Sequence, residues 1–340
     1  MNLTERLKHQ AHATGFDLAG TCPAVAPDGI HHFYRWLENG FAGDMGYIEQ
    51  RRDAYAHPKG VLPEVRSLLV LGTYYATTDH APSPPGFGRV SNYAWGEGDY
   101  HDLIHGRLKQ LVKWLSSEVP SSRSRGVVDT APLLERDFAR LAGLGWVGKN
   151  TMLINRDAGS YFFLAAVLTD VELEYDDRFS VDHCGKCTAC LDQCPTDAFP
   201  EPYVLDATKC ISYLTIEHRT AIDESLRQGI GDWLFGCDVC QQVCPWNRKP
   251  QPTCEPTFHP LNNMNPIDLC ELFELTDDAF RSRFRKTPLW RAKRTLILRN
   301  AAIVLGNQKF GPAKPVLRRA LNDSEEIVCD ACQWALDRIG

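Results

Sequence analysis

The sequence lacks the features that would place it in a membrane or an export pathway. No apolar run is long enough to cross a bilayer, so we expect no membrane-spanning segment. The N-terminus, MNLTERLKHQ, is polar and amphipathic, without the pattern of a secretory or twin-arginine signal. We therefore expect a cytoplasmic protein in a reducing environment, with 340 residues divided into two or three domains.

Nucleotide-binding signatures are also missing. No Walker A sequence occurs. Gly143, Gly145 and Gly148 have the G-x-G-x-x-G spacing, but they follow a predicted helix rather than a strand, and no acidic residue is correctly placed about twenty residues later. Because a dinucleotide pyrophosphate needs the strand–turn–helix context, the sequence argues against a nicotinamide site.

Cysteine, in contrast, is abundant, with 13 residues in the chain. Two runs have the spacings C-x2-C-x2-C-x3-C-P and C-x2-C-x3-C-P. Their members are Cys184, Cys187, Cys190 and Cys194 in the first run and Cys237, Cys240 and Cys244 in the second. This is the spacing of two-cluster ferredoxins, in which each run gives three thiolates to one 4Fe–4S cluster and its last cysteine to the other. The sequence thus predicts electron transfer to a second site.

The second run lacks its first cysteine, because Leu234 occupies that position. Cys210 is the only other cysteine in this part of the chain, so we expect it to complete the second set from a distance. The predicted ligands of one cluster are Cys184, Cys187, Cys190 and Cys244. The predicted ligands of the other are Cys194, Cys210, Cys237 and Cys240.

Other uses of these cysteines are less consistent with the pattern. Two zinc sites are the main alternative, since C-x2-C pairs also bind zinc. The overlapping triplets, each followed by Cys-Pro, favour iron–sulfur clusters. A disulfide framework is disfavoured by the length of the chain and the absence of an export signal. The remaining cysteines have no ligand spacing, and we expect ordinary thiols at Cys22, Cys254, Cys270, Cys329 and Cys332.

The first part of the chain, residues 1–175, has the pattern of an α/β domain. Helices are predicted near residues 3–13 and for about twenty residues from Asp99. Buried strands are predicted at 67–76 and 125–130. Further predicted elements are a long loop over 79–92, a helix from Pro132 to Ala142, and a strand pair formed by NTMLI and SYFFLAAVLTD.

The rest of the chain divides into two further regions. Residues 176–250 hold the cysteine runs and predict a ferredoxin-like module with two 4Fe–4S clusters. Residues 251–340 begin with a Pro- and Asn-rich linker and continue as an all-α region. Helices at 298–307 and 329–340 resemble the stacked helix pairs of HEAT-type repeats, which present extended binding surfaces.

Positive charge is concentrated in one segment, although the chain carries a net charge of −6. Residues 281–299 contain eight basic residues and no acidic one. Such a segment is a candidate for contact with phosphate groups. A solvated helix face is the equally weighted alternative.

Asp129 is the best single candidate for a catalytic acid. It ends the predicted strand 125–130 just before a helix, where α/β folds place functional groups. The alternative, favoured from the residues alone, is that Asp129 and Thr130 cap the following helix.

Taken together, the motifs resemble those of the epoxyqueuosine reductase family. They are VVDTAPLLERDFA, GLGWVGKNTMLI, CGKCTACLDQCPTDA, CISYLTIEHR, GCDVCQQVCPWN and RNAAIVLGN, and they span nearly the whole chain. The resemblance implies an enzyme that depends on cobalamin and two 4Fe–4S clusters and reduces epoxyqueuosine to queuosine at the wobble position of tRNA, the final step of queuosine biosynthesis. It also implies a cobalamin domain similar to that of reductive dehalogenases and a HEAT-like region that helps to hold the tRNA.

The resemblance assigns roles to individual residues. Asp129 becomes the proton donor near cobalt, which reverses the preference for a helix cap. The implied corrin contacts, several through backbone groups, are Arg51, Ser91, Asp129, Leu153, Leu164, Ser212, Cys237 and Asp238. The implied tRNA contacts are Arg136, Arg291, Lys293, Arg294 and Asn300.

The implied chemistry is a relay of electrons from an external low-potential donor through the clusters to cobalt, with Asp129 supplying a proton to the epoxide oxygen. We expect burial near an apolar corrin face to raise the pKa of Asp129 so that it carries this proton. Two alternatives are a corrinoid and iron–sulfur reductase of a small molecule, similar to dehalogenases, and a ferredoxin-type electron-transfer subunit. The protein is expected to be a monomer, with its tRNA partner bound through the anticodon stem-loop.

Overall fold

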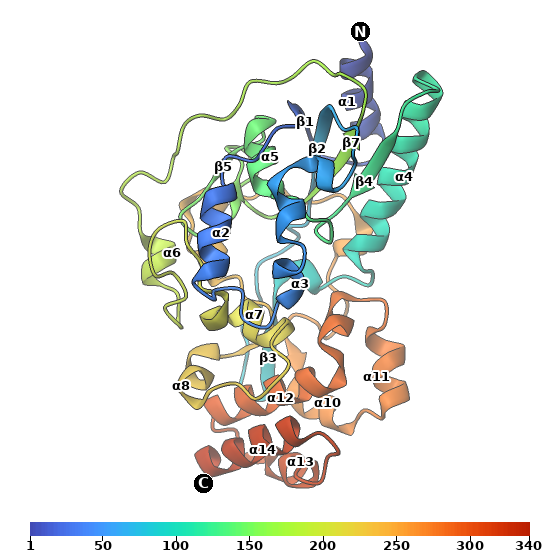
Figure 1. The fold of residues 1–340 in the computed structure, drawn as a ribbon. Coiled ribbons are helices and arrows are strands. Elements are labelled where there is room, and N and C mark those ends of the chain that lie inside the picture. Colours follow the sequence, from blue (N-terminus) through green and yellow to red (C-terminus); the bar gives the residue numbers. More distant parts are fainter.

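The computed structural model describes all residues, 1–340, and its N-terminal part is built on a four-stranded antiparallel sheet (Figure 1). The strand order is β1-β2-β7-β4, with bounds β1 (Leu18–Pro23), β2 (Ser67–Tyr74), β7 (Phe162–Thr169) and β4 (Ser124–Val127). The predicted strands at 67–76 and 125–130 are therefore present, although the second ends at Val127. The N-terminal part is an α/β domain, as the sequence predicts.

Helices cover both faces of this sheet. Alternate residues of β2 point to opposite faces: Leu69 and Leu71 join the core formed with α1 (Leu3–Ala13) and α4 (Tyr100–Glu118). Leu68 and Val70 join a second core with α5 (Glu135–Leu141). The helices predicted at 3–13 and after Asp99 are confirmed, and the Asp99 side chain caps α4 by accepting from the His101 N–H. Smaller helical segments α2 (Ile30–Glu38), α3 (Gly46–Glu49) and η1 (Arg52–Ala56) connect β1 to β2.

Two local predictions in this part are wrong. The segment predicted as a loop, 79–92, contains strand β3 (Phe87–Val90). It pairs with β8 (Trp233–Phe235) and β9 (Ile267–Asp268), which local sequence patterns cannot reveal because both partners are distant in the chain. The predicted pairing of NTMLI with the following strand also fails, because β6 (Leu153–Ile154) pairs instead with β5 (Trp146–Val147).

The region that holds the cysteine runs, residues 176–250, is called the cluster module below. It contains only short elements: α6 (Ala189–Asp192), α7 (Ile211–Ile216), α8 (Glu224–Arg227), α9 (Val239–Gln242) and strand β8. In Figure 1 its yellow segments lie between the sheet domain and the C-terminal helices. Its buried apolar residues, among them Ile211, Leu214 and Phe235, belong to a core that it shares with the C-terminal helices, so neighbouring regions hold it in place.

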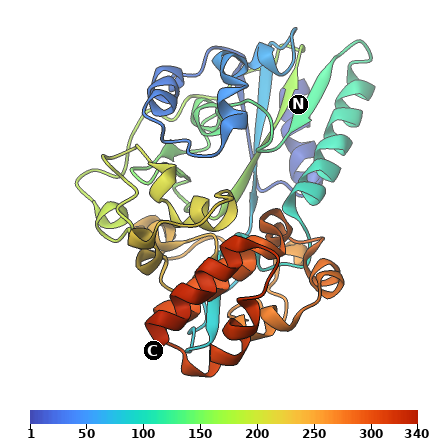
Figure 2. The ribbon, with the colours of Figure 1, turned by 60° about the horizontal axis from the view of Figure 1, so that its bottom comes forward.

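The C-terminal region is helical, as predicted. Its elements are α10 (Leu269–Glu274), α11 (Asp277–Phe284), α12 (Lys293–Asn307), α13 (Lys314–Ala320) and α14 (Glu326–Ile339). Helix α12 is buried without interruption from Leu296 to Gly306 and packs against α14 (Figure 2). Its resemblance to HEAT repeats stays a prediction.

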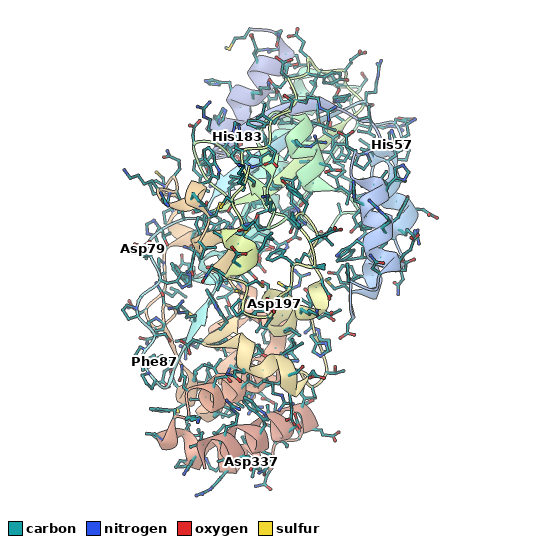
Figure 3. All side chains as sticks on the ribbon, turned by 90° about the vertical axis from the view of Figure 1, so that its left-hand side faces the viewer. His57, Asp79, Phe87, His183, Asp197 and Asp337 are labelled. Carbon is teal, nitrogen blue, oxygen red and sulfur yellow. The ribbon has the colours of Figure 1, made fainter.

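One hydrophobic core joins the three regions of the chain. It contains Val90 of β3, Phe235 of the cluster module and Ile303 of α12. In Figure 3, Asp79 and Phe87 follow one another along one side of the molecule toward the C-terminal helices, where Asp337 lies. The N-terminal part thus extends a segment into the C-terminal core. None of the helices combines the length and the apolarity needed to cross a bilayer.

Candidate active site

Four cysteines line one small cavity in the cluster module. The cysteines are Cys194, Cys210, Cys237 and Cys240, and the apolar residues Pro195, Ala198, Phe199, Leu205, Ile211 and Val239 complete the lining. Burial raises the pKa of the Cys237 and Cys240 thiols well above its ordinary value. Such thiols stay protonated in this apolar setting unless a bound cation removes the proton. These are the four cysteines predicted for one cluster.

The other four predicted ligands form a second group. Burial, followed by the neighbouring thiols of Cys184 and Cys244, raises the pKa of Cys190 to about 11, and Cys187 lies in the same group. Cys187 is exposed and Cys244 is buried, so this group reaches from the interior to the surface. Lys149 fixes the loop beside it by donating from Nζ to the carbonyls of Gly185 and Cys187, at 2.7 and 2.9 Å.

Neither group is arranged as a site for a single ion. No group of three His, Cys, Asp or Glu side chains in the protein is arranged to hold a single metal ion. Four of the cysteines instead line a common apolar cavity. This arrangement fits a cluster of several atoms better than the tetrahedral zinc sites considered as the alternative.

Asp129 lies at the end of β4 and is held by two residues of α4. Its carboxylate accepts hydrogen bonds from the Tyr100 hydroxyl and from Nε2 of His101, the latter at 2.8 Å. Nδ1 of His101 is 2.7 Å from the Asp99 carboxylate. Because α5 begins only at Glu135 and has no side-chain cap, the helix-cap alternative for Asp129 is wrong.

The backbone at Asp129 has a φ of 31°, in the left-handed region that a non-glycine residue rarely adopts. This turn ends β4 before the predicted boundary and directs the carboxylate toward α4. Arg51 fixes the next residue, since its Nη1 donates to the carbonyl of Thr130 at 2.8 Å. About a third of the Asp129 side chain, 34%, stays exposed, so it is accessible to a ligand.

The charge state of this pair differs from the expectation. Partial burial favours the neutral acid, but hydrogen bonds from His101 and Tyr100 and the charge of Arg291 outweigh it and hold the pKa of Asp129 below its ordinary value. Burial opposes the His101 imidazolium, but hydrogen bonds to Asp129 and Asp99 raise the pKa of His101 to about 9. The expected rise in the pKa of Asp129 is therefore wrong. At neutral pH the proton resides on His101.

An aromatic wall connects this pair with the cluster module. The Tyr100 ring stacks on Phe163, with centroids 4.1 Å apart and planes at 9°. The Tyr93 ring lies edge-on to Tyr100 at 6.0 Å and 6.2 Å from Phe235. Burial raises the pKa of Tyr93, and the carboxylates of Asp238 and Asp129 both contribute. Tyr93 thus lies between Asp129 and the cysteine-bearing segment.

Comparisons with known proteins match the whole chain. A family model described as epoxyqueuosine reductase QueG, DUF1730, matches residues 56–130, and a 4Fe-4S double cluster binding domain matches residues 183–247. The chain is 40% identical to an epoxyqueuosine reductase of Pseudomonas aeruginosa, over 99% of this chain and 95% of that protein. The chain belongs to the epoxyqueuosine reductase family. It is also 38% identical to the Escherichia coli epoxyqueuosine reductase, over 98% of this chain and 89% of that protein.

Solved structures agree with this assignment. An epoxyqueuosine reductase crystallised with an epoxyqueuosine-modified tRNA-Tyr stem loop has a TM-score of 0.93 and 31% identity, over 99% of this chain and 90% of that chain. A structure of the Bacillus subtilis epoxyqueuosine reductase, described with its catalytic aspartate loop swung out of the active site, has a TM-score of 0.91 and 30% identity, over 99% of this chain and 90% of that chain.

Residues to which the family resemblance assigns corrin contacts fall on both sides of the aromatic wall. Arg51, the residue that precedes η1, lies on the Asp129 side, since it donates to the Thr130 carbonyl, and Leu164 lies in β7. On the other side, the Ser91 hydroxyl and the Asn92 N–H donate to Asp238, which is fully buried and also lies 2.8 Å from His80 Nε2.

The remaining candidates for corrin contact differ in whether their side chain or only their backbone is available. The Leu153 side chain is buried in the sheet core, so only its backbone is available. Ser212 lies in α7, two residues after Cys210, and Cys237 precedes Asp238. Gly236, with a φ of 69°, lets this segment approach Ser91, because a Cβ there would be 2.5 Å from the Ser91 Cβ.

Three of the predicted tRNA contacts have exposed side chains, and one of them, Arg291, lies close enough to Asp129 for its charge to act there. Arg291 is exposed, pairs with Glu217 at 2.8 Å, and its charge acts on Asp129 and Tyr100. Lys293 is exposed and lies over the Trp290 ring, 3.8 Å from its centroid. Arg136 is exposed and donates to the carbonyl of Thr151.

Asn300 is placed differently, and its predicted contact with tRNA is wrong. Its side chain has no exposed surface and donates to the carbonyls of Thr215 and Leu234, both at 2.9 Å. Arg294 is partly neutralised by Asp277 and Asp323, at 3.3 and 3.0 Å.

The basic segment 281–299 is therefore not one surface. Arg299 is buried and donates to the carbonyls of Leu214, His218 and Thr220. The exposed basic residues of the segment without an ion pair are Arg281, Arg285, Lys286 and Lys293.

Tyr100 and His101 are partners of Asp129 that the sequence does not reveal. Their only signal is three consecutive polar or aromatic residues at the start of a helix. Nothing in the local pattern shows that this helix end faces the end of β4.

Proposed function

We propose that this protein reduces epoxyqueuosine to queuosine at the wobble position of tRNA, with cobalamin and two 4Fe–4S clusters as cofactors. The observation that carries the proposal is the wall of aromatic rings between the Asp129–His101 pair and the cysteine cavity. We infer from this arrangement that a proton donor and an electron-transfer module serve a single site. Family membership supports the identity of the substrate.

The cysteine groups fit two iron–sulfur clusters. We assign Cys194, Cys210, Cys237 and Cys240 to the cluster nearer Asp238, and Cys184, Cys187, Cys190 and Cys244 to the other. When bound, such clusters transfer single electrons. Because Cys187 is exposed, the second group is the side from which an external low-potential donor reaches the protein.

The residues between Asp129 and Cys237 fit a corrin. The Asn92 Oδ1 atom is buried without a hydrogen-bond partner, and the corrin periphery carries amide N–H groups that such an acceptor can bind. Tyr93 and Phe163 supply flat apolar surface. Ser91, Ser212 and Leu164 are the further groups that we assign to holding the corrin. Bound cobalamin supplies a strongly reducing metal centre for C–O cleavage.

The chain's own residues supply the proton and its position. His101 carries the proton at neutral pH and shares it with Asp129, whose carboxylate is directed by the Tyr100 hydroxyl. Arg51 holds the loop through Thr130. Asp129 then delivers the proton to the leaving epoxide oxygen as a general acid.

We assign the tRNA to the exposed basic residues around Arg291, whose charge acts on Asp129, and we take this surface as the entrance to the site. Burial, followed by the positive charges of Arg219 and Arg281, lowers the pKa of Lys293. The three charged side chains therefore lie close to one another. Tyr47 lies on α3 and is 45% exposed. Partial burial raises the pKa of its hydroxyl, and the charges of Arg291 and Asp129 also act on it, which places Tyr47 near both. We assign it to contact with the nucleoside that enters the site. A cytoplasmic monomer is the form that we propose to bind tRNA.

The direct test is conversion of the modified nucleoside. Protein purified without oxygen, given cobalamin and a low-potential reductant, is expected to convert epoxyqueuosine in tRNA to queuosine, measured by mass spectrometry of the digested nucleosides. Omission of cobalamin is expected to stop conversion. Reduction of halogenated small molecules instead of tRNA would support the dehalogenase-like alternative, and clusters without any bound corrinoid would support an electron-transfer subunit.

A charge-removing substitution tests the tRNA surface. Lys293→Ala is expected to weaken tRNA binding and to lower the slope of log affinity against log salt by about one unit, because one phosphate contact is lost. Arg318→Ala removes an equally exposed charge from α13, away from the entrance, and is the matched control. Fluorescence anisotropy at several salt concentrations measures both. Equal slopes for the two variants would contradict this assignment.

A further inference from the structure

The proposed reaction, on which this inference rests, consumes two protons. Both C–O bonds of the epoxide break, a C=C bond forms and the oxygen leaves as water. Two electrons come from the external low-potential donor through the clusters, and two protons must be delivered to the site. The Asp129–His101 pair holds only one mobile proton at neutral pH. The second proton therefore comes either from water or from another proton-bearing group near Asp129.

Glu135 is a second carboxyl group beside this pair. Glu135 is the first residue of α5, and the loop after Asp129 brings its side chain back toward Asp129. The backbone N–H of Asp129 is near enough to the Glu135 carboxyl group to lower its pKa. Its Oε1 atom is buried and has no hydrogen-bond partner. A buried carboxylate oxygen without a partner is costly, whereas the protonated acid is tolerated. No part of the mechanism above uses Glu135.

We propose that Glu135 is the proton reservoir of this site: it stores the second proton as a neutral acid and returns it to the Asp129–His101 pair after the first transfer. Glu135 then acts through Asp129 and does not touch the substrate, so it is a positioning and proton-supplying residue.

The charges around Glu135 favour this direction of transfer. Burial, followed by the negative charge of Asp129, raises the pKa of Glu135 to about 8, against the opposing effects of the Asp129 N–H, Arg136 and His101. Tyr55 of η1 also faces it. Because the pKa of His101 is about 9, a proton moves downhill from Glu135 to the pair once His101 has lost its own.

A purely structural role makes a different prediction. A glutamate in the first turn of a helix stabilises the helix through its negative charge. In that case Glu135 would be ionised at neutral pH, and its replacement would change the stability of the protein without changing how the rate depends on pH.

The first test follows the protonation of Glu135 in the protein without substrate. Infrared difference spectra between pH 6 and pH 10 are expected to contain a buried carboxylic acid C=O band that disappears with a midpoint near 8. The band should be absent in Glu135→Gln, and its midpoint should fall in Asp129→Asn, where the neighbouring charge is gone. Glu97→Gln, an exposed glutamate, is the control and should retain the band. A Glu135 that is already ionised at pH 7 would overturn the proposal.

The second test uses steady-state kinetics on epoxyqueuosine-containing tRNA. Glu135→Gln is expected to lower kcat about tenfold, below the ~10²–10⁴ of a direct general acid, with KM unchanged. The wild-type rate should fall as the pH rises through about 8, and this ionisation should be missing in the variant. Glu135→Asp should partly restore both. An unchanged pH profile in Glu135→Gln would refute the reservoir. Failure of the wild-type protein to convert the substrate would instead refute the proposed function, while the infrared result would still stand.

Discussion

Replacing Asp129 with asparagine is expected to abolish turnover, with a loss of ~10²–10⁴ in the single-turnover rate. Asparagine keeps the shape of the side chain and can still accept a hydrogen bond from Tyr100. It cannot take up and release a proton, and it removes the charge that keeps His101 protonated. Both proton-bearing functions of the pair are therefore lost. Nucleoside mass spectrometry after rapid quenching measures the effect.

Controls separate this chemical loss from a loss of structure. Asp129→Asn should retain its iron, its corrinoid and its affinity for tRNA. Asp99→Asn removes only the outer partner of His101 and should have a smaller effect. Turnover at the wild-type rate in Asp129→Asn would eliminate the acid role.

The pH dependence of stability provides an independent check on the same pair. The folded-state pKa of His101, about 9, is above its ordinary value, so protonation stabilises the folded protein. This stabilisation is fully present below about pH 6.5 and is lost as the pH rises through about 9. The difference in melting temperature between wild type and Asp129→Asn should therefore be largest in mild acid and should shrink above pH 9.

Local patterns in the sequence account for much of the fold. The continuous apolar run from Leu68 to Leu71 indicates a strand buried on both faces, because side chains of a strand alternate between the faces. Asp99 marks the start of α4 because a side-chain acceptor satisfies a free N–H at a helix end. The two cysteine groups were also predictable, because in the two-cluster spacing each run gives its last cysteine to the other cluster, and the missing ligand leaves only Cys210.

Features that depend on distant partners were not predictable in this way. Asn300 and Arg299 belong to a basic segment, yet both are buried because carbonyls of α7 and the following loop accept their hydrogen bonds. The pKa of Asp129 depends on His101, which a different element positions. Strand β3 exists only because two distant strands pair with it. In each case the partner lies far away in the sequence.

Cys210 is the site of the second prediction with a large effect. Cys210→Ala is expected to lose one cluster, so that iron and acid-labile sulfide fall by about half, because each predicted cluster uses four thiolates. Turnover should fall below detection, because Cys210 lines the same cavity as Cys237, which directly precedes Asp238 in the chain. Iron and sulfide analysis, with electron paramagnetic resonance of the reduced protein, measures the loss.

The effect should extend beyond the cluster, because Cys210 directly precedes α7. Carbonyls of α7 accept the hydrogen bonds of Arg299 and Asn300, so this helix connects the cysteine cavity to α12. Loss of the cluster should therefore loosen the C-terminal helices and increase amide exchange in α12. Cys254→Ser, which removes an exposed thiol outside both groups, is the control and should change neither iron nor exchange. If Cys210→Ala kept its full iron content, the assignment of Cys210 as a ligand would be wrong, and the fourth ligand of that cluster would have to come from another part of the chain.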